Sequence, residues 1–304
     1  MNDDFESLFD AVLFDCDGVL YQSDTVLPGA VEVVSELISR KIPVRIVTNS
    51  STKTRTALRN KLQSLGFLDI QTSFCFPTSF CAAELLRTNH PHAKCVYVIG
   101  EQGLVEELEM AGYDVIGGPL HNGKIMSDAE FVSLGNSGTL SLIDAVVVGY
   151  DRGFNYYKLA FASLVFQCNP ACIFVATNPD FHDRIGGKWL VPVNGCALSA
   201  VVSAINNSDI KKKIEPIITG KPNPLYGDLV LKTSGLAHLD PSRVLMVGDK
   251  IETDIRLAKN CGFKSLLVLS GCATEISPLT PPEDQPDFVL KGLKDMADWL
   301  MRRK

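Results

Sequence analysis

The chain has 304 residues, a formal net charge of −6 and 46% hydrophobic residues, an ordinary globular composition with enough length for about two domains. This composition excludes a disordered or fibrous chain. The acidic balance argues against non-specific nucleic-acid binding, which needs a basic surface, and the apolar runs are far shorter than the roughly 20 residues of a membrane helix. We therefore expect a two-domain soluble protein that binds neither nucleic acid nor membranes.

The N-terminus and the cysteines favour a cytoplasmic location. Residues Met1–Asp4 are acidic and lack the charged-then-apolar pattern of a signal or transit peptide. The nine cysteines are odd in number, widely spaced and without a Cys-x-x-Cys pair, so we expect free thiols in a reducing compartment. The five histidines do not form a zinc-binding pattern.

Short apolar runs alternate with amphipathic stretches along most of the chain. The first part predicts a strand at Ala11–Phe14, a helix at Ala30–Arg40, a strand at Pro43–Val47 and a helix at Thr52–Leu65. Further strands are predicted near Cys95–Ile99, Ala145–Val148, Ile173–Ala176, Ile217–Thr219, Val244–Val247 and Ser265–Leu269, and helices near Leu104–Ala111, Tyr156–Phe166, Leu198–Ile205, Leu225–Ser234 and Thr253–Asn260. Such alternation is typical of parallel sheets that are covered on both faces, so we expect a doubly wound, Rossmann-like α/β fold.

Two polar segments interrupt the alternation. Gly117–Gly138 is rich in Gly, Ser, Asn and Asp and indicates an irregular excursion, and Asn206–Lys213 indicates a polar connector. We therefore expect a core domain formed by residues 1–89 and 210–304, with a smaller α/β domain inserted at residues 90–209.

Polar residues follow four of the predicted strands. They are Asp15 and Asp17, then Thr48, Asn49 and Ser50, then Lys221, and finally Asp249 and Asp254. Each alone has a simpler explanation as a turn residue, a helix cap or a solvated lysine. In doubly wound sheets, however, active sites form beyond the carboxyl ends of the strands, which the fold brings together. The joint occurrence therefore favours one shared site.

The chemistry of this set suits phosphoryl transfer through a carboxylate. Three or four aspartates would repel one another strongly unless a cation lay among them, and oxygen ligands of this kind favour Mg²⁺. A hydroxyl group, N–H groups at a helix start and a lysine together suit a phosphate. A carboxylate beside a bound phosphate can attack it to give an aspartyl-phosphate, and a second carboxyl two residues on can act as general acid and then base.

In chain order, these segments resemble the four motifs of the haloacid dehalogenase-type phosphatases. The motifs are Asp15-Cys16-Asp17-Gly18-Val19, Val47-Thr48-Asn49-Ser50, Gly220-Lys221-Pro222, and Gly248-Asp249 followed by Asp254. Further segments resemble one branch of this family, which contains 4-nitrophenylphosphatases, phosphoglycolate phosphatases, pyridoxal phosphate phosphatases and NagD. They include Leu27-Pro28-Gly29-Ala30 and Ala176-Thr177-Asn178-Pro179-Asp180. The resemblance covers about residues 11–275.

The resemblance implies a role for each of these residues. Asp15 would be the nucleophile and a metal ligand, Asp17 the general acid and base with its carbonyl on the metal, and Asp249 a further ligand. Lys221 would neutralise both the phosphate and Asp15. Asp254 would support the metal site either through water or by orienting Lys221. The predicted phosphate-binding residues are Thr48, Asn49, Ser50 and Lys221.

The inserted domain resembles the large α/β cap of this branch, whose loops close over the active site and contact the leaving group. Asn178–His182 matches the position of the substrate-specificity loop. We therefore expect Asn178, Asp180 and His182 to bind substrate. Homodimers that form through the cap are common in the branch, so the resemblance also implies a homodimer formed through the inserted domain.

The leading hypothesis is a Mg²⁺-dependent phosphatase of small phosphomonoesters, with 4-nitrophenyl phosphate as a test substrate and phosphoglycolate, pyridoxal phosphate or a similar metabolite as the natural one. The alternatives are a non-catalytic phospho-accepting module, a partner-binding protein on the same fold, and a dehalogenase. Asp17 argues against the phospho-accepting module, which needs no general acid, and Asp17 with Asp249 argues against a dehalogenase. The sequence leaves the physiological substrate and the oligomeric state open.

Overall fold

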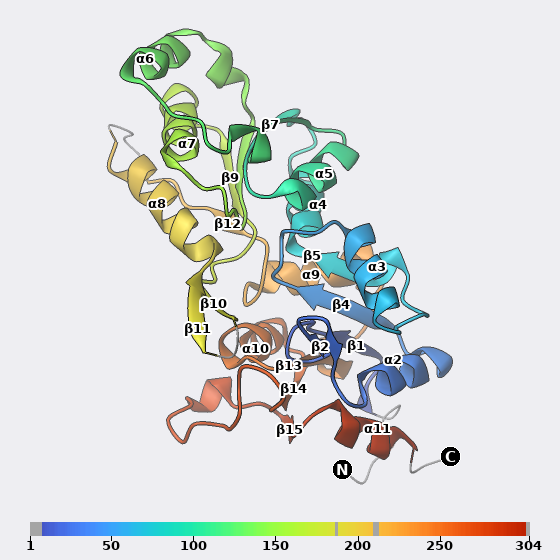
Figure 1. Cartoon of the computed structure of the whole chain (residues 1–304). Coiled ribbons are helices and arrows are strands. Elements are labelled where there is room, and N and C mark those ends of the chain that lie inside the picture. Colours follow the sequence, from blue (N-terminus) through green and yellow to red (C-terminus); the bar gives the residue numbers. More distant parts are fainter. Residues whose placement is uncertain (1–7, 186–187, 209–212, 302–304) are drawn as a thin grey trace. The chain divides into compact units, whose positions relative to one another are not determined.

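The computed structural model describes residues 8–185, 188–208 and 213–301 (Figure 1). By its internal contacts the chain divides into two units. The first comprises residues 1–48, 55–76 and 221–304, and the second comprises residues 49–54 and 77–220. The second unit, which we expected to be the smaller, is nearly as long as the first. Each unit is described by itself below.

The boundaries of the inserted unit differ from the predicted ones at residues 90 and 209. Helix α4 (Thr78–Asn89) packs against α5 (Gln102–Met110), and strand β12 (Ile217–Ile218) pairs with β9 (Ile173–Ala176). Residues 77–89 and 213–220 therefore belong to the second unit, because packing and strand pairing define it rather than local polarity. The predicted junction between residues 209 and 210 lies outside the described residues.

The first unit is built on a six-stranded sheet with the order β15-β14-β13-β1-β4-β5. Its strands are β1 (Ala11–Phe14), β4 (Val44–Thr48), β5 (Cys75–Pro77), β13 (Val244–Gly248), β14 (Lys264–Val268) and β15 (Phe288–Leu290). From β15 to β4 every neighbouring pair is parallel. The strand order reverses between β1 and β13, and such a switch point is where doubly wound sheets bind ligands.

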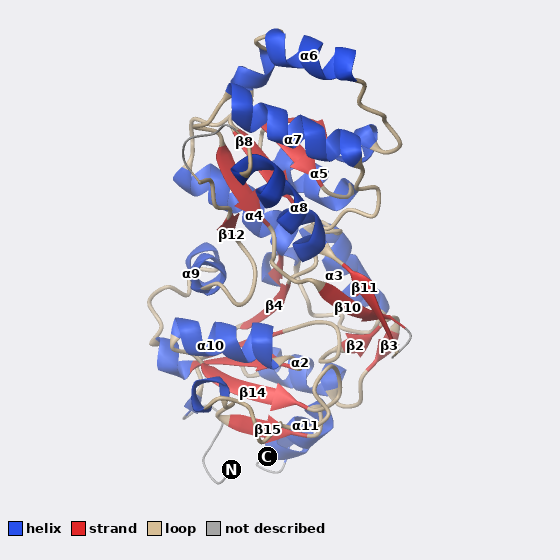
Figure 2. Ribbon diagram, turned by 90° about the vertical axis from the view of Figure 1, so that its left-hand side faces the viewer, coloured by secondary structure: helices blue, strands red, loops and turns tan. Residues whose placement is uncertain are grey.

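The helices of the first unit are drawn in blue in Figure 2, with the strands of its sheet in red. They are α2 (Ala30–Ser39), α3 (Arg55–Ser64), α9 (Pro224–Thr233), α10 (Arg256–Cys261) and α11 (Leu293–Met301). Helix α2 packs against α11, where Val34 and Met296 join Val12 and Phe14 in one buried cluster. Helix α9 packs against α10 and contributes no residue to that cluster. The doubly wound α/β prediction is therefore confirmed.

The second unit contains a five-stranded parallel sheet with the order β12-β9-β8-β6-β7. The strands not yet introduced are β6 (Cys95–Ile99), β7 (Asp114–Gly117) and β8 (Ala145–Val148). Helices α7 (Tyr156–Cys168) and α8 (Asn194–Asn206) pack together over one face, where Phe161 and Val201 meet Val146. This is a second doubly wound order, and its switch point lies between β6 and β8.

Several elements were not predicted. The segment expected to be irregular contains α6 (Asp128–Asn136), whose first backbone N–H groups are capped by the Ser127 side chain at Glu130 N (3.2 Å). Two antiparallel hairpins are also present, β2–β3 (Tyr21–Gln22 and Thr25–Val26) and β10–β11 (His182–Ile185 and Trp189–Pro192). Strands β2 and β3 have only two residues each, β10 is mostly polar, and the four residues of β11 do not alternate between apolar and polar, so none shows a period of two. A π-helical turn, Ile251–Ile255, precedes α10, and short 3₁₀ turns lie at Thr72–Phe74, Gly118–His121, Thr139–Leu142, Pro241–Arg243 and Pro282–Asp284.

Within the described ranges, every helix is too short or too polar to cross a lipid bilayer.

Candidate active site

Four predicted site residues meet at the switch point of the first unit. Asp15 follows β1, Asp249 follows β13, and Asp254 lies in the π-helical turn after it. The carboxylates of these three aspartates each place an oxygen within 4.8 Å of the others. Lys221, which lies shortly before α9, reaches the same cluster. The strand topology therefore brings together residues that are up to 239 positions apart in the sequence.

Lys221 is the cation that the structure places among these carboxylates. Its Nζ donates to Asp15 Oδ1 at 2.5 Å and to Asp254 Oδ1 at 2.7 Å, and its side chain is almost fully buried. Burial opposes the positive charge, but the two carboxylates outweigh burial and raise the pKa of Lys221. Lys221 is therefore charged at neutral pH and positioned to attract an anion.

Asp254 uses its two oxygens for different tasks. While Oδ1 accepts from Lys221, Oδ2 accepts from the backbone N–H groups of Asp249 (3.2 Å) and Lys250 (3.1 Å). A side chain on Gly248 would overlap the Asp254 side chain, so glycine is required there. We expected Asp254 to support the metal site either through water or by orienting Lys221, and this geometry supports the second of these roles.

The carboxylate of Asp249 is closely packed between the backbones of two glycines, Gly18 and Gly271. Its Oδ2 accepts from the backbone N–H of Cys272 at 2.6 Å. A Cβ atom on Gly18 or Gly271 would overlap the Asp249 carboxylate, and Gly18 also has a left-handed φ of 79°. Burial, together with the charge of Asp254, raises the pKa of Asp249 to about 6.

The carboxylate cluster fits a divalent metal ion. Burial raises the pKa of Asp15 well above its usual range, with Lys221 opposing that shift and the other two aspartates adding to it. A cation would relieve the cost of burying like charges close together. Carboxylate oxygens are the ligands that Mg²⁺ prefers. Asp15 and Asp249 are therefore suited to hold Mg²⁺.

Asp17, the predicted general acid and base, lies outside this carboxylate cluster. Its side chain is exposed, and its backbone forms an isolated bridge with Tyr21 at the start of the β2–β3 hairpin. The neighbouring Gly18 N–H donates to Tyr21 O at 2.8 Å. The hairpin therefore fixes the backbone of Asp17, while its carboxyl group stays accessible to solvent.

The predicted phosphate-binding residues follow β4. Thr48 is the buried last residue of that strand, and its carbonyl oxygen accepts from the Tyr226 hydroxyl at 3.3 Å. Asn49 and Ser50 begin the loop of residues 49–54, which by its contacts belongs to the second unit. Helix α3 begins at Arg55, so the predicted helix start at Thr52 was wrong. Residues of the second unit form hydrogen bonds with this loop, among them the backbone N–H of Thr78, which donates to Ser50 O at 3.1 Å.

The predicted substrate-binding residues of the inserted unit lie in two environments. Asn178 is buried, and its Nδ2 donates to Asn49 O at 2.7 Å. Asp180 accepts at Oδ2 from Asn49 Nδ2 at 2.8 Å. His182 is exposed at the start of β10, opposite Pro192. The structure thus joins Asn178 and Asp180 to the phosphate-binding loop, and a leaving-group contact by His182 stays a prediction.

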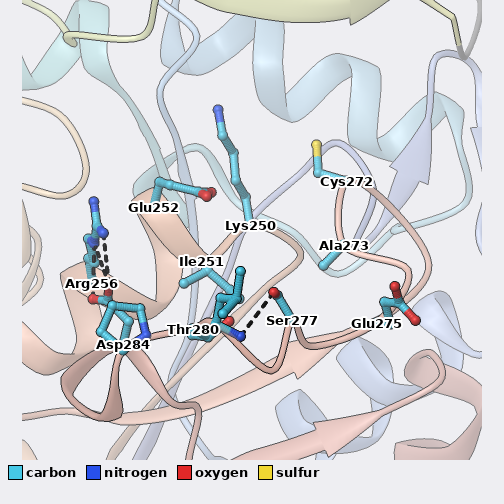
Figure 3. Close-up of a pocket in the computed structure, with 12 residues that line it drawn as sticks. Lys250, Ile251, Glu252, Arg256, Cys272, Ala273, Glu275, Ser277, Thr280 and Asp284 are labelled. Carbon is cyan, nitrogen blue, oxygen red and sulfur yellow. Dashed lines mark hydrogen bonds and ion pairs between the residues drawn. The ribbon is translucent and has the colours of Figure 1, made fainter.

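The loop after β14 contributes to the site and was missed in the sequence. Besides the Cys272 N–H on Asp249, the Ser270 hydroxyl donates to Gly18 O at 2.8 Å. Both contacts involve backbone atoms, and the only available signal was the Ser270-Gly271 pair directly after a predicted strand. A cavity of about 430 Å³ adjoins this loop; its lining includes Lys250, Glu252, Arg256, Cys272, Ser277, Thr280 and Asp284 (Figure 3).

The fold and the site define a doubly wound α/β protein with a buried centre of aspartates and a lysine at a sheet switch point. The sequence model of the family described as haloacid dehalogenase-like hydrolase matches residues 12–114, and a related HAD-like hydrolase model matches residues 218–296. Phosphoglycolate phosphatase 2 of Arabidopsis thaliana is 36% identical over 301 residues, which cover 96% of this chain and 94% of that protein. Glycerol-3-phosphate phosphatase of Gallus gallus is 36% identical over 267 residues, which cover 87% and 81%.

Solved structures are also similar to this chain over most of its length. The p-nitrophenyl phosphatase from Archaeoglobus fulgidus superposes with a TM-score of 0.75 at 26% identity, covering 96% of this chain and 99% of that one. NagD from E. coli K-12 gives a TM-score of 0.71 at 25% identity and covers 94% and 98%. The chain belongs to the haloacid dehalogenase-like hydrolase family, and within it this protein is a phosphatase, a phosphoric monoester hydrolase.

Proposed function

We propose that this protein is a Mg²⁺-dependent phosphatase that hydrolyses small phosphomonoesters through an aspartyl-phosphate on Asp15. The observation that carries the proposal is the buried contact of 2.5 Å between Lys221 and Asp15, beside the carboxylates of Asp249 and Asp254. This arrangement sets a nucleophile next to a fixed positive charge, in a place that also suits a metal ion.

The chain's own residues account for both halves of the reaction. Asp15 attacks phosphorus, the bond between phosphorus and the ester oxygen breaks, and Asp17 protonates the departing oxygen. Asp17 then takes a proton from water, which attacks phosphorus, so that inorganic phosphate leaves and Asp15 is regenerated. Lys221 balances the negative charge of Asp15 and of the phosphate. Mg²⁺, held by Asp15, Asp249 and the Asp17 carbonyl, would neutralise further charge on the phosphate oxygens.

Removal of the metal tests this proposal directly. We expect purified protein to hydrolyse 4-nitrophenyl phosphate, EDTA to abolish the activity, and added Mg²⁺ to restore it. The physical reason is that three buried carboxylates without a metal ion repel an anionic substrate. Nitrophenolate release, followed by absorbance, measures the effect, with added Ca²⁺ as the comparison ion. A rate that EDTA leaves unchanged would remove Mg²⁺ from the proposal.

Phosphoglycolate is the substrate that the comparisons favour first, because phosphoglycolate phosphatase 2 matches almost the whole chain. Glycerol 3-phosphate is the second candidate, on the same kind of evidence. The two differ in charge, since phosphoglycolate carries a carboxylate in addition to its phosphate. A phosphoglycolate site therefore calls for a second cation, separate from Lys221.

Arg152 is suited to that task. It follows β8 at the switch point of the second sheet, its side chain is 73% exposed, and its guanidinium lies 3.7 Å from Glu101 and over the Tyr150 ring. The loop that carries Arg152 is fixed by a buried ion pair between Lys158 and Asp151 at 2.5 Å. An exposed arginine guanidinium is a good partner for a substrate carboxylate.

We therefore expect Arg152→Ala to raise the KM for phosphoglycolate roughly tenfold, as for the loss of one charge-assisted hydrogen bond. The KM for glycerol 3-phosphate should change little. Steady-state kinetics on both substrates measure the effect, with Lys94→Ala as the control, since Lys94 is exposed at the amino end of the same sheet. An equal change for both substrates would exclude carboxylate recognition by Arg152.

A further inference from the structure

The structure assigns a different role to two residues of the inserted unit that we expected to bind substrate. We propose that Asn178 and Asp180 are positioning residues, which hold Asn49 and with it the phosphate-binding loop of residues 49–54. This inference rests on the proposed function, in which that loop binds the phosphate. In this proposal the inserted unit positions the side chains that bind the phosphate, which is the group that all substrates share.

Asn49 is held through both its side chain and its main chain. Asp180 Oδ2 accepts from Asn49 Nδ2 at 2.8 Å, and Asn178 Nδ2 donates to Asn49 O at 2.7 Å. The Thr78 hydroxyl donates to the same carbonyl oxygen at 2.8 Å. An ionised carboxylate can only accept hydrogen bonds, so Asp180 determines which end of the Asn49 amide faces it. The orientation of this amide is therefore fixed.

The segment that holds Asn49 is itself anchored. Asn178 Oδ1 accepts from Asp180 N at 3.1 Å, which closes a tight turn. At the start of α8, Asn194 Nδ2 donates to Asn178 O at 2.6 Å and Gly195 N donates to Asp180 O at 2.6 Å. A side chain on Gly195 would meet the carbonyl oxygens of this turn, so the approach of α8 requires glycine. Asn178 and Asp180 are therefore parts of a rigid support.

The rest of the loop is attached to the same unit. Ser51 is fully buried, and its hydroxyl accepts from Tyr150 N at 3.1 Å. The Ser79 hydroxyl donates to Lys53 O at 2.5 Å. Contacts with the second unit thus hold Asn49, Ser51 and Lys53, and Ser50 O accepts from the backbone N–H of Thr78 at 3.1 Å.

A positioning role and a leaving-group contact predict different kinetics. Because every substrate shares the phosphate, a displaced Asn49 should weaken the binding of all substrates by one common factor, and the binding of inorganic phosphate by the same factor. A lost leaving-group contact should instead change substrates unequally and leave inorganic phosphate unaffected. The metal ligands lie in the first unit, so the dependence on Mg²⁺ concentration should not change in either case.

The test uses Asp180→Ala and Asn178→Ala, with Asp183→Ala as a control. Asp183 follows Asp180 by three residues, is exposed in the β10–β11 hairpin, and accepts at Oδ1 from the adjacent Arg184 N at 2.8 Å. KM and kcat are measured for 4-nitrophenyl phosphate, phosphoglycolate and glycerol 3-phosphate, and Ki for inorganic phosphate. We expect both variants to raise all KM values and the phosphate Ki by a similar factor of roughly ten, while the control stays within twofold of the wild type. Asp180→Asn keeps an acceptor oxygen and should recover part of the loss.

A double variant makes the test specific for Asn49. If Asp180 acts through Asn49, Asp180→Ala should add nothing to the defect of Asn49→Ala. Additive effects, a change confined to one substrate, or an unchanged Ki for phosphate would each overturn the proposal. If Asp180→Ala does not fold, Asp180→Asn and Asn178→Ala give the same comparison. If the wild type hydrolyses none of the three esters, the proposed function fails, and calorimetry of phosphate binding by the same variants still decides the positioning role.

Discussion

Asp15→Asn should reduce the turnover of 4-nitrophenyl phosphate by roughly four orders of magnitude or more, since loss of a nucleophile costs at least this much in enzymes with covalent intermediates. The variant keeps the size of the side chain and an oxygen that can accept from Lys221, whose Nζ lies 2.5 Å from Asp15 Oδ1. The protein should therefore fold, and its lost activity should reflect the missing carboxylate rather than a collapsed site.

Asp24→Asn is the matched control for this measurement. Asp24 lies in the turn of the nearby β2–β3 hairpin, its side chain is 94% exposed, and its contact with Lys61 is a loose 3.7 Å. We expect wild-type rates from it. If Asp15→Asn retained the wild-type rate, the covalent mechanism would be wrong. If Asp15 became phosphorylated but never lost its phosphate, the alternative of a phospho-accepting module would gain support.

Lys221→Met should produce the second large effect, on both stability and activity. The variant leaves the buried carboxylates of Asp15 and Asp254 without their shared cation. Breaking a buried ion pair by removing one partner costs about 3 to 5 kcal/mol of the free energy of unfolding, because an uncompensated charge stays buried. The lost positive charge should also weaken the binding of an anionic substrate, with kcat/KM down by roughly two orders of magnitude or more.

Urea unfolding and steady-state kinetics measure these two effects, and Arg243→Met is the control. Arg243 directly precedes β13, so it lies at the opposite end of the sheet, and its ion pair with Asp10 at 2.7 Å is partly exposed. Loss of an exposed pair should cost about 1 kcal/mol or less and leave kcat/KM unchanged. A Lys221→Met protein with wild-type stability and activity would show that the buried pair contributes neither to the fold nor to the reaction.

The buried strands of the fold could be predicted from the sequence alone. The predicted bounds of β1, β6, β8 and β9 match the structure, because strands covered on both faces are continuous apolar runs. Helix α4 was not predicted, since its mixture of small, polar and apolar residues shows little amphipathic pattern, and its packing on α5 moved the boundary of the inserted unit. Long-range packing of this kind leaves no local signal.

The same distinction holds for the site. Asp15, Lys221, Asp249 and Asp254 could be grouped because each follows a predicted strand and the topology of a doubly wound sheet joins those strand ends. The contacts of Asn178 and Asp180 with Asn49 span about 130 residues, and no local pattern encodes them. The Cys272 N–H on Asp249 is a backbone contact, which any residue at that position could make.

The central claim is that hydrolysis proceeds through a phosphate bound covalently to Asp15. The most direct test is to quench the enzyme with acid during turnover of 4-nitrophenyl phosphate, reduce the acyl phosphate with borohydride, and locate the modified residue by mass spectrometry. We predict that the reduced product is found at Asp15, forms within the first turnover and disappears once substrate is exhausted. Full hydrolytic activity without modification at Asp15, or with modification at another residue, would contradict the mechanism.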